Sequence, residues 1–444
     1  MNEIEKIKND IVAFYKAKKI DIDVVNVVES YAVTSYYAKI DTTKTDLKKV
    51  EKALDDLALY AGAKNITLKT DFENKNIVFE IPNKNRKTLK YSELIKEQKK
   101  QNGGLFLNIG ATTGNDFLNV NLCKTPHLLI AGTTGAGKSV LINTILLNLL
   151  ENYTPDELQV LLIDAKQVEL TPFENIPHLH NYIVKNLHDT KAELRRVLAT
   201  IQARYSIMKN SNNKNIETYN ATHAHKFPYI VVIIDELADL ILQDKKEKTL
   251  FNESLEDIIC RIAQIGRASG VHLIVSTQRP SVDIITGLIK ANIPSRIALN
   301  VASATDSRVI LDAKGAERLT GNGDFLFKLI GNADLIRLQG AYIDEQEQEK
   351  RIDAIIEKHR DYVIKKEQER TKELEQMKKR FEQEQKQKQT NVLTDEEKEE
   401  RKAKRFAIYK LIFDLLLSPL GLILLALILF VLGFFKFAVP IINK

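Results

Sequence analysis

Short runs of apolar residues, each about as long as a strand, stand out in the middle of the chain. His127–Ala131, Tyr229–Ile234 and Val271–Ser276 are apolar at nearly every position instead of alternating with polar residues. Strands of that kind are typical of a parallel sheet that helices cover on both faces. Directly after the first run, Val140–Leu150 is apolar at helical spacing, which predicts a helix packed on the sheet. The pattern therefore predicts an α/β fold with a mainly parallel sheet.

Residues 1–100 follow a different pattern and are predicted to form a small α+β lead-in domain. We expect helical structure within Lys44–Tyr60 and strands at Val24–Val28, Ser35–Ile40, Ile66–Lys69 and Ile77–Ile81. The first residues, Met1–Lys19, carry many charges and no apolar stretch, which excludes a signal peptide. Nothing in this segment resembles a catalytic constellation.

The segment Leu415–Phe435 contains no charged residue and has the composition of a membrane-spanning helix. As a helix it would extend about 30 Å, the thickness of the hydrocarbon core of a bilayer. We therefore expect a single transmembrane helix over residues 411–437 in the cell membrane, followed by a short tail over 438–444. The basic cluster Arg401–Arg405 favours a cytoplasmic location for everything upstream. A re-entrant hairpin bent at Pro419 stays open as an alternative.

The charge of the chain limits which partners it can bind, and its cysteine content indicates the redox state of its compartment. Residues 346–410 are dense in alternating acids and bases without a regular heptad, so we expect a charged helical or coiled spacer. The formal net charge of +6 permits a nucleic-acid partner without requiring one. Cys123 and Cys260 lie far apart and fit no metal or redox spacing, which indicates a reducing, cytosolic setting for the soluble part.

The residues between the first apolar run and its helix fit the phosphate-binding pattern G-x-x-x-x-G-K-[ST]. They are Gly132, Thr133, Thr134, Gly135, Ala136, Gly137, Lys138 and Ser139. Glycines here let the backbone curl so that successive N–H groups face phosphate oxygens, beside the positive end of the helix. We expect Lys138 to reach the β- and γ-phosphates of ATP, and the Ser139 hydroxyl to hold Mg²⁺.

Two adjacent carboxylates, Asp235 and Glu236, end the apolar run that begins at Tyr229. Ligands bind at the carboxyl ends of strands in parallel sheets, so both acids are expected beside the phosphate-binding loop. We assign Asp235 to the Mg²⁺ shell. Glu236 is the candidate for polarising the attacking water, because its carboxylate can accept a proton. A protein that only bound the nucleotide as a switch would not need Glu236.

Several segments resemble, in the same order, the FtsK/SpoIIIE family of hexameric DNA-pumping ATPases. They are Ala53–Asn65, Phe79–Asn83, Pro126–Ser139, Leu162–Lys166, Asp235–Asp239, Gly266–Leu273 and Thr277–Arg296. The last of these is the longest and the most specific. Ala165 is a departure, since the family usually has proline at that place. The similar segments fall within residues 20–345.

The resemblance implies a RecA-like P-loop motor domain over residues 101–345, assembled as a hexameric ring around DNA. It also implies that Gln278 senses the γ-phosphate, and that Arg267 is presented to the nucleotide of the neighbouring subunit. A guanidinium supplied in this way stabilises charge on the transferred phosphoryl group. Arg261 and Arg279 remain rivals for that role. Contacts with DNA are expected to go mainly to backbone phosphates, so binding should weaken steeply as salt rises.

The resemblance does not extend to two modules of the family, and it therefore does not fix which cargo the protein moves. Family members in chromosome segregation usually carry N-terminal membrane helices and a C-terminal winged-helix module, and neither is visible in this sequence. We expect a membrane-anchored, ATP-driven translocase of double-stranded DNA, used for DNA transfer or partitioning. One alternative is a conjugative coupling or type VII-like secretion ATPase that moves single-stranded DNA–protein or protein cargo. Another is a membrane scaffold that uses ATP only to assemble.

Overall fold

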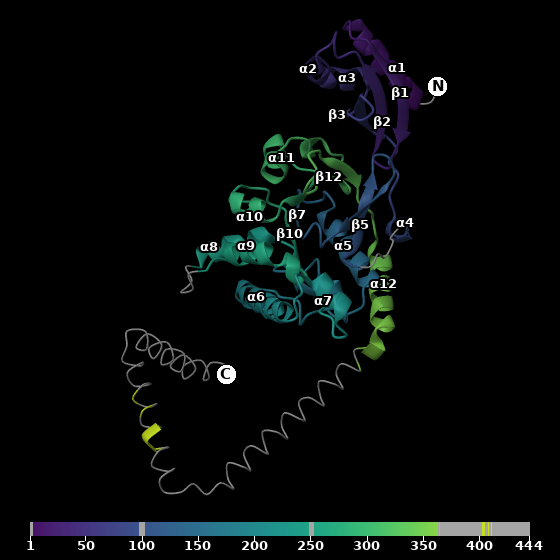
Figure 1. The fold of residues 1–444 in the computed structure, drawn as a ribbon. Helices are drawn as coiled ribbons and strands as arrows, with labels where there is room; N and C mark the ends of the chain where they lie inside the picture. The colour runs from purple at the N-terminus through teal and green to yellow at the C-terminus, as the bar shows by residue number, and fades with distance from the viewer. Residues whose placement is uncertain are drawn as a thin grey trace, which may run out of the picture. The chain divides into compact units, whose positions relative to one another are not determined.

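One mixed sheet of nine strands organises the part of the chain that follows the lead-in domain (Figure 1). The computed structural model describes residues 3–96, 103–247, 253–362, 364, 402–404, 407 and 410. Within these residues the strand order is β6-β5-β13-β12-β11-β7-β10-β9-β8. The neighbours from β11 to β8 run parallel, and β12, β13, β5 and β6 extend the sheet in antiparallel fashion. The parallel part is as predicted, whereas the antiparallel part was not.

The apolar runs of the sequence became strands at the centre of the parallel part. The bounds are β5 (Phe106–Thr112), β6 (Phe117–Asn121), β7 (His127–Ala131), β8 (Leu158–Ile163), β9 (Tyr229–Ile234), β10 (Val271–Thr277), β11 (Ser295–Leu299), β12 (Asp324–Lys328) and β13 (Ile336–Gln339). The predicted strands are confirmed as β7, β9 and β10. A strand as short as β13 gives too little periodicity to be found from sequence.

Successive residues of each parallel strand enter two different cores, one on each face of the sheet. In β7, Leu128 and Ile130 join one cluster of buried side chains, and Leu129 and Ala131 join the other. Side chains of a strand alternate between faces, so a strand covered on both sides must be apolar throughout. This is why the runs seen in the sequence have no polar positions.

Helices cover both faces of this sheet (Figure 1). On one face lie α4 (Tyr91–Lys96), α5 (Lys138–Asn152), α7 (Ile216–Thr222) and α12 (Glu345–Lys358). The other face carries α6 (Leu187–Asn210), α8 (Leu237–Lys246), α9 (Leu255–Ile265), α10 (Gly287–Asn292) and α11 (Ala304–Leu311). The described residues also contain three short 3-10 turns: η1 (Thr171–Phe173), η2 (Arg267–Ser269) and η3 (Ala316–Arg318). The predicted helix at Val140–Leu150 is confirmed as α5.

The lead-in segment forms its own antiparallel sheet of four strands in the order β1-β2-β4-β3. The strands are β1 (Ile22–Glu29), β2 (Val33–Ile40), β3 (Thr67–Asp71) and β4 (Asn76–Pro82), with helices α1 (Glu3–Ala17), α2 (Leu47–Lys52) and α3 (Leu54–Ala61). The predicted α+β pattern is thus confirmed. The sequence analysis missed α1, whose many charges hide an apolar stripe that buries Ile11 and Tyr15. The Tyr15 hydroxyl donates to the backbone oxygen of Val50, 3.0 Å away.

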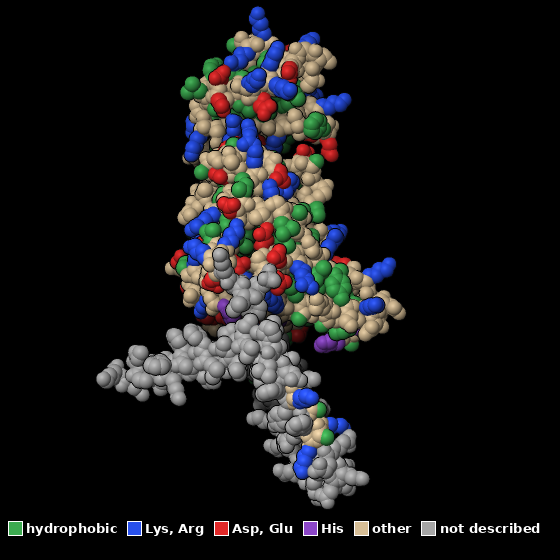
Figure 2. Space-filling model, turned by 90° about the vertical axis from the view of Figure 1, so that its left-hand side faces the viewer, with side chains coloured by type: hydrophobic (Ala, Val, Ile, Leu, Met, Phe, Trp, Pro, Cys, Tyr) green, Lys and Arg blue, Asp and Glu red, His purple; other side chains and the backbone are tan. Residues whose placement is uncertain are grey.

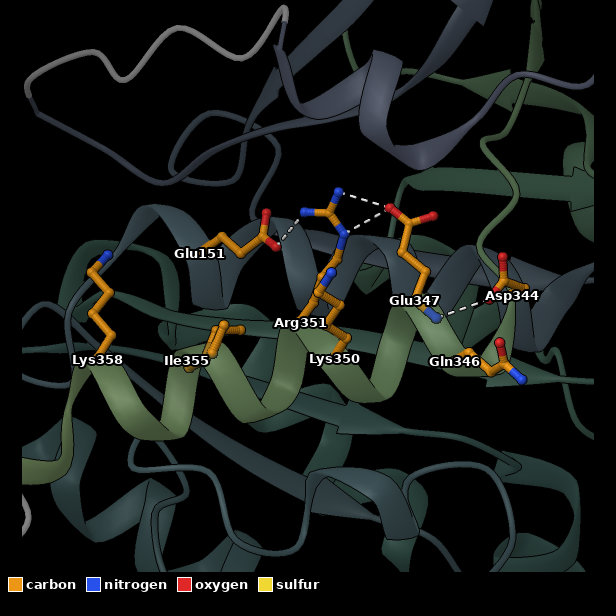
Figure 3. Close-up of a pocket in the computed structure, with 9 residues that line it drawn as sticks. Glu151, Asp344, Gln346, Glu347, Lys350, Arg351, Ile355 and Lys358 are labelled. Atoms are coloured by element: carbon orange, nitrogen blue, oxygen red, sulfur yellow. Dashed lines mark hydrogen bonds and ion pairs between the residues drawn. The ribbon is translucent and has the colours of Figure 1, made fainter.

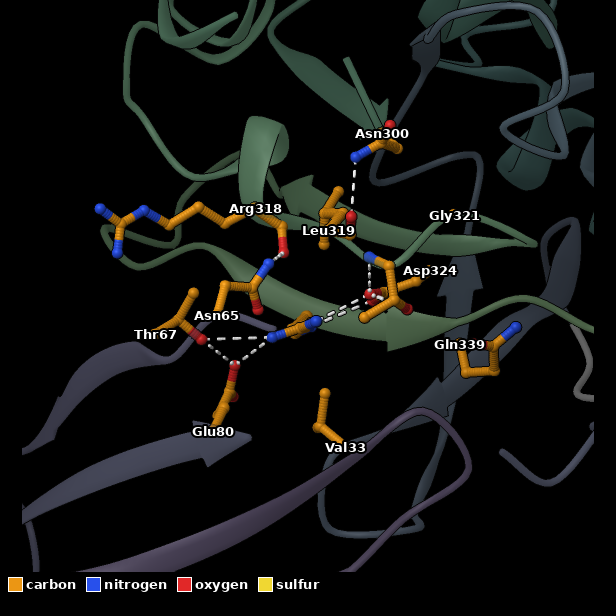
Figure 4. A network of polar contacts seen from close by, with 12 residues as sticks. Val33, Asn65, Thr67, Glu80, Asn300, Arg318, Leu319, Gly321, Asp324 and Gln339 are labelled. Carbon is orange, nitrogen blue, oxygen red and sulfur yellow. Dashed lines mark hydrogen bonds and ion pairs between the residues drawn. The ribbon is translucent and has the colours of Figure 1, made fainter. Parts of the chain in front are cut away.

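A buried arginine joins the two sheets (Figure 4). Arg337 on β13 donates to both oxygens of Asp324 on β12, at 3.0 and 2.7 Å, and to Glu80 on β4, at 2.9 Å. Burial works to raise the pKa of the Glu80 carboxyl, but Lys69 and Arg337 outweigh it and hold that pKa below its usual value. The lead-in sheet therefore contacts the large sheet through a buried arginine and two carboxylates that neutralise its charge. The predicted boundary at residue 100 stays a prediction, since Met1–Val363 forms one compact unit.

Helix α12 packs along α5, the helix that follows the phosphate-binding loop (Figure 3). Arg351 donates to Glu151 of α5 at 2.9 Å and to Glu347 of its own helix, and its guanidinium lies 4.8 Å from the centre of the Tyr91 ring. Ile352 and Ile355 are buried beneath it. The first turns of the predicted spacer thus belong to the compact unit.

Most of the predicted spacer, the predicted transmembrane helix over residues 411–437 and the tail over 438–444 lie outside the described residues. None of the helices in the described part combines the length and the apolar character that a membrane span requires. The membrane segment therefore stays a prediction.

Candidate nucleotide site

The carboxyl ends of three neighbouring parallel strands bring the predicted site residues to one edge of the sheet. In the register of the sheet, Thr277 at the end of β10 lies opposite Ala131 at the end of β7. On its other side, Val275 of β10 lies opposite Ile234, the last residue of β9. The phosphate-binding loop after β7, the two acids after β9 and Gln278 after β10 therefore meet, as the sequence predicted.

Loop residues 132–139 close tightly on the antiparallel part of the sheet. Gly137 has φ +102, and a Cβ added there would lie 2.8 Å from the backbone nitrogen of Gly323. That nitrogen donates to the backbone oxygen of Ala136 at 2.9 Å, and the backbone N–H and hydroxyl of Thr133 both donate to the oxygen of Asn300. Only glycine fits such a close approach in a left-handed conformation.

Helix α5 begins at Lys138 with Gly137 as its N-cap and no side-chain cap. The first N–H groups of a helix have no partner within the helix, and they carry its positive end. At this loop they are free of a capping side chain and turn toward the place where a phosphate would lie. The loop therefore has the construction of an anion site.

The Lys138 ammonium is buried between the loop and the acid strand. Its Nζ donates to Oδ1 of Asp235 at 2.8 Å, to the backbone oxygen of Asp235 at 2.9 Å and to the Ser276 hydroxyl at 3.1 Å. Only 3% of the residue is exposed. A buried ammonium needs such oxygen partners, and phosphate oxygens offer the same chemistry.

Glu236 is held at the junction of β10 and α8. Its carboxylate accepts from the Thr277 hydroxyl at 2.6 Å, from the Gln278 N–H at 3.0 Å and from the N–H of Ala238 at 3.3 Å, the last as N-cap of α8. Lys166 adds a contact at 3.8 Å. Glu236 is 2% exposed and, like Asp235, does not line the adjoining cavity. Both acids are thus buried next to the cavity, without forming part of its surface.

Gln278 connects the acid strand to the phosphate-binding loop. Its side-chain oxygen accepts from the Thr134 hydroxyl at 2.9 Å, and its backbone N–H donates to Glu236. Gln278 also lines the cavity beside the loop. One residue therefore contacts both candidate catalytic elements, which the sequence did not reveal.

The donors for Mg²⁺ are hard oxygens, as the ion requires. Ser139 lies in the first turn of α5, lines the cavity and is partly exposed, and the Asp235 carboxylate lies behind Lys138. Within the described residues no cluster of three or more His, Cys, Asp or Glu side chains could hold a metal by itself. Mg²⁺ commonly takes one or two protein oxygens and completes its shell with phosphates and water, so these residues fit it.

Arg267 lies at the opposite edge of the sheet from the loop. It opens η2, before the start of β10, and its Nε donates to the backbone oxygen of Cys123 at 3.1 Å. Because β10 has 7 residues, its two ends are separated by about 20 Å. Arg267 is exposed, and across this distance it does not reach the phosphate-binding loop of its own chain.

The rival arginines occupy different places. Arg279 follows Gln278 on the loop side of the sheet, is exposed and lies 3.8 Å from Asp239. Arg261 is on α9 and lies 3.9 Å from Glu253. Long exposed contacts of this kind hold a side chain weakly.

A cavity of about 640 Å³ opens from the loop and includes residues that the sequence analysis missed. The missed lining residues are Arg86, Lys87, Thr88, Glu169, Asn322, Gly323, Gln339, Gly340, Ala341 and Tyr342. Their only signal in the sequence is the glycine-rich turn Gly321–Gly323, which is typical of a loop and of no particular ligand. Segments far apart in sequence thus complete the site.

Comparison with known proteins agrees with this geometry. Residues 92–282 match the model of the FtsK/SpoIIIE family. The protein named DNA translocase FtsK in Clostridium acetobutylicum is 40% identical over 339 residues, which is 74% of this chain and 43% of the relative. The protein of the same name in Helicobacter pylori is 38% identical over 376 residues, 82% of this chain and 44% of the relative. The chain spans less than half the length of these curated relatives.

Solved structures support the fold. The pCW3 conjugation coupling protein TcpA, in a monomer form with ATPγS, is 23% identical with a TM-score of 0.54, over 79% of this chain and 99% of that one. The cytoplasmic domain of the type VII secretion ATPase EccC of Thermomonospora curvata is 22% identical with a TM-score of 0.52, over 60% of this chain and 34% of that one. By its sequence relatives and by the segment that matches the family model, the chain belongs to the FtsK/SpoIIIE family.

Proposed function

We propose that this protein is an ATP-driven DNA translocase that hydrolyses ATP at the subunit interfaces of a ring and pumps double-stranded DNA. The observation that carries the proposal is the buried Lys138 ammonium, held between a phosphate-binding loop and the acid strand. Relatives about 40% identical are named DNA translocases, which supports the choice of cargo.

Lys138 provides the charge that binds and orients the triphosphate. Burial keeps the ammonium out of solvent, its three oxygen partners hold it at the ends of β9 and β10, and a phosphate group would take over part of this coordination. The Asp235 carboxylate and the Ser139 hydroxyl would be the protein groups that hold Mg²⁺. Bound Mg²⁺ would neutralise charge on the β- and γ-phosphates.

Glu236 and Gln278 connect hydrolysis to movement. Glu236 polarises the attacking water, which replaces one of the hydrogen-bond donors that its carboxylate has in this structure, such as the Thr277 hydroxyl. Gln278 senses the γ-phosphate through its hydrogen bond with the loop residue Thr134. Loss of the γ-phosphate changes the bonds at the end of β10, and this change passes into Arg279–Thr286, where Arg279 and Val282 are exposed. That segment is our candidate for transmitting force to the DNA backbone.

Arg267 and the segment over residues 411–437 extend the proposal to the assembly. Arg267 serves a neighbouring subunit in a hexameric ring, and the apolar segment anchors the ring in the cell membrane with the motor in the cytoplasm. Deleting residues 411–444 should move the protein from the membrane fraction to the soluble fraction, whereas Lys138→Ala should leave it in the membrane. Release of both variants would contradict the anchor.

The test of function is ATP turnover by the full chain in mild detergent, with duplex DNA, with single-stranded DNA and without DNA. We expect duplex DNA to raise the rate most and Lys138→Ala to abolish turnover under all three conditions. A greater response to single-stranded DNA would favour conjugative cargo. No response to either polymer would favour protein cargo, as in type VII-like secretion.

A further inference from the structure

The cavity beside the phosphate-binding loop extends beyond the loop residues themselves. Its lining outside the loop includes two segments, residues 86–88 and residues 339–342, which we call the far end because they lie away from Gln278, on the α5 side of the loop. The first segment leads out of the lead-in sheet, because β4 ends at Pro82. The second follows the end of β13 at Gln339. The geometry of this far end raises the question of which part of a ligand it accepts.

The two ends of the cavity differ in chemistry. Gln278, which contacts Glu236 and the loop residue Thr134, marks the end where a phosphoryl group would react. ATP is linear, so its nucleoside must lie away from the reacting phosphate. Gln278 lies at Thr134, whereas Gly340 lies against Leu141 of α5 and Arg86 bonds to Gln339, so residues 86–88 and 339–342 line the cavity on the α5 side of the loop.

Arg86 presents a fixed guanidinium plane at this far end. Its Nη1 donates to the backbone oxygen of Thr320 at 3.1 Å, and its Nη2 donates to the oxygen of Gly321 at 3.0 Å and to Oε1 of Gln339 at 3.1 Å. These bonds are made by N–H groups in the plane of the guanidinium, so none of them uses its face, and the residue is partly exposed. Arginine planes are good surfaces for stacking nucleobases.

Tyr342 is the aromatic side chain among the described lining residues, and 53% of it is exposed. Its backbone is held in place, because its N–H donates to Leu89 at 2.7 Å and its oxygen accepts from Tyr91 at 2.9 Å. The same short segment that carries Arg86 thus also fixes the position of Tyr342. An exposed ring on a fixed backbone is a second surface that suits a base.

We infer that Arg86 is a nucleoside-binding residue of the ATP site, stacking on the base while Tyr342 borders it. The inference rests on the proposed function, since it concerns the same nucleotide. It also means that the lead-in domain contributes directly to the ATP site, through a residue only a few positions beyond its last strand.

The experiment compares binding of ATP and of inorganic tripolyphosphate, which has the phosphates without the nucleoside. Titration calorimetry on the full chain in mild detergent measures both affinities. We expect Arg86→Ala to weaken ATP binding roughly 10-fold while tripolyphosphate binding changes less than about twofold. Arg86→Lys should not restore ATP binding, because lysine keeps the charge but lacks the planar face. Lys138→Ala should weaken both ligands.

Arg318→Ala is the matched control. Arg318 also links the two sheets, donating to the backbone oxygen of Ile66 at 3.2 Å, but it does not line the cavity. It should leave both affinities unchanged. Equal losses of ATP and tripolyphosphate in Arg86→Ala, or full rescue by Arg86→Lys, would overturn the inference.

The unaltered chain provides a test that does not depend on any variant folding. If it binds tripolyphosphate as tightly as ATP, the far end of the cavity contributes nothing and the inference is wrong, while the proposed function stands. If it binds neither ligand, the proposed function itself fails. The two failures are therefore distinguishable.

Discussion

Glu236 has several hydrogen-bond donors around its carboxylate in the present structure. The Thr277 hydroxyl, the Gln278 N–H and the Ala238 N–H all donate to it. Such bonds fix the orientation of a general base, and one of them has to be exchanged for the attacking water. Glutamine has the same shape and can still accept hydrogen bonds, but it cannot take up a proton.

We therefore predict that Glu236→Gln binds ATP with nearly normal affinity while turnover falls by roughly 100-fold or more. Binding is measured by titration with ATP and turnover by phosphate release in the presence of duplex DNA. The control is Glu174→Gln, which changes an exposed carboxylate that does not line the cavity. Turnover by Glu236→Gln at the level of that control would assign the role of base to another group, and a scaffold that needs ATP only for assembly would become the better explanation.

Some residues of the site could be predicted from the sequence and others could not. Lys138, Asp235 and Glu236 could be assigned because each lies at the end of a strand, at a spacing that the chemistry demands. Arg86 and Tyr342 could not, because nothing local distinguishes an arginine or a tyrosine that lines a cavity from one on any other surface. Their role depends on segments that meet only after folding.

At the scale of elements, Arg337 connects the sheet of the lead-in domain to the large sheet. It is 4% exposed and pairs with Glu80 and Asp324, which are both buried. We predict that Arg337→Ala lowers the free energy of unfolding by about 3–5 kcal/mol, because both buried carboxylates lose Arg337 and Glu80 keeps only Lys69 as an ionic partner. Urea denaturation of the full chain, followed by circular dichroism, measures the change.

The matched control is Arg318→Ala, which removes a second arginine between the same sheets. Arg318 is partly exposed, contacts the exposed Asp55 at 3.6 Å and donates to the backbone oxygen of Ile66 at 3.2 Å, so its loss should cost only about 1 kcal/mol. If the two substitutions destabilise the protein equally, burial of the Arg337 network is not what holds the sheets together.

The pairing of β7 with β10 contains a buried histidine that should make stability depend on pH. The Leu273 N–H donates to Nδ1 of His127, so the proton is on Nε2, which donates to the oxygen of Ala263 at 3.0 Å. Burial lowers the pKa of His127 from 6.5 to about 4, against a small opposing effect of the bond to Ala263. Protonation would also remove the acceptor of the Leu273 N–H.

The folded pKa of His127 is below that of the unfolded chain, so its stabilising effect is present above pH 6.5 and is lost as the pH falls toward about 4. Over that interval we predict a loss of up to about 3 kcal/mol from this residue. Urea unfolding at a series of pH values measures it. His127→Gln should flatten the dependence, and His188→Gln, which changes a histidine whose side chain is 91% exposed, should not. Identical slopes for both variants would contradict the prediction.

Elements were predictable where their pattern was long or unbroken. The strands β7, β9 and β10 and the helix α5 were visible because burial on both faces demands continuous apolar runs. In contrast, α1 is covered with charges and β13 has only 4 residues, so both depend on contacts that no local pattern encodes.

At the scale of the whole molecule, the position of Arg267 across the sheet from the loop requires a neighbouring chain if it acts in catalysis. We predict that Arg267→Ala and Lys138→Ala are each inactive, and that mixing them restores activity. In mixed rings an intact Lys138 on one chain can meet an intact Arg267 on the next, giving up to about a quarter of normal turnover. ATP turnover of each variant and of an equimolar mixture measures this.

The same mixing experiment with Arg261→Ala and with Arg279→Ala identifies the arginine that acts in trans. The variant that regains activity beside Lys138→Ala supplies the guanidinium. A mixture no more active than its separate components would contradict catalysis across subunits.

The distribution of charged side chains on the surface affects how strongly the protein would attract the proposed DNA cargo. Figure 2 shows lysine and arginine side chains interspersed with acidic ones on the face it presents, in keeping with the modest net charge of +6. A surface of mixed charges holds a polyanion less firmly than a continuous basic patch. For a pump that must release each phosphate as it moves, such limited attraction is suitable.

The sequence by itself determined the parallel strands, the helix after the loop, the phosphate-binding residues and the acids beside them. Each of these follows from a local requirement: continuous apolar runs for burial on both faces, glycines for a loop around phosphate, and carboxylates at the ends of strands. Only the tertiary structure decided that Gln278 contacts Thr134 and Glu236, that Arg267 lies across the sheet, and that Arg86 lines the site. These relations join residues that are distant in sequence, and they arise from packing of the sheets against each other, which no short stretch of the chain specifies.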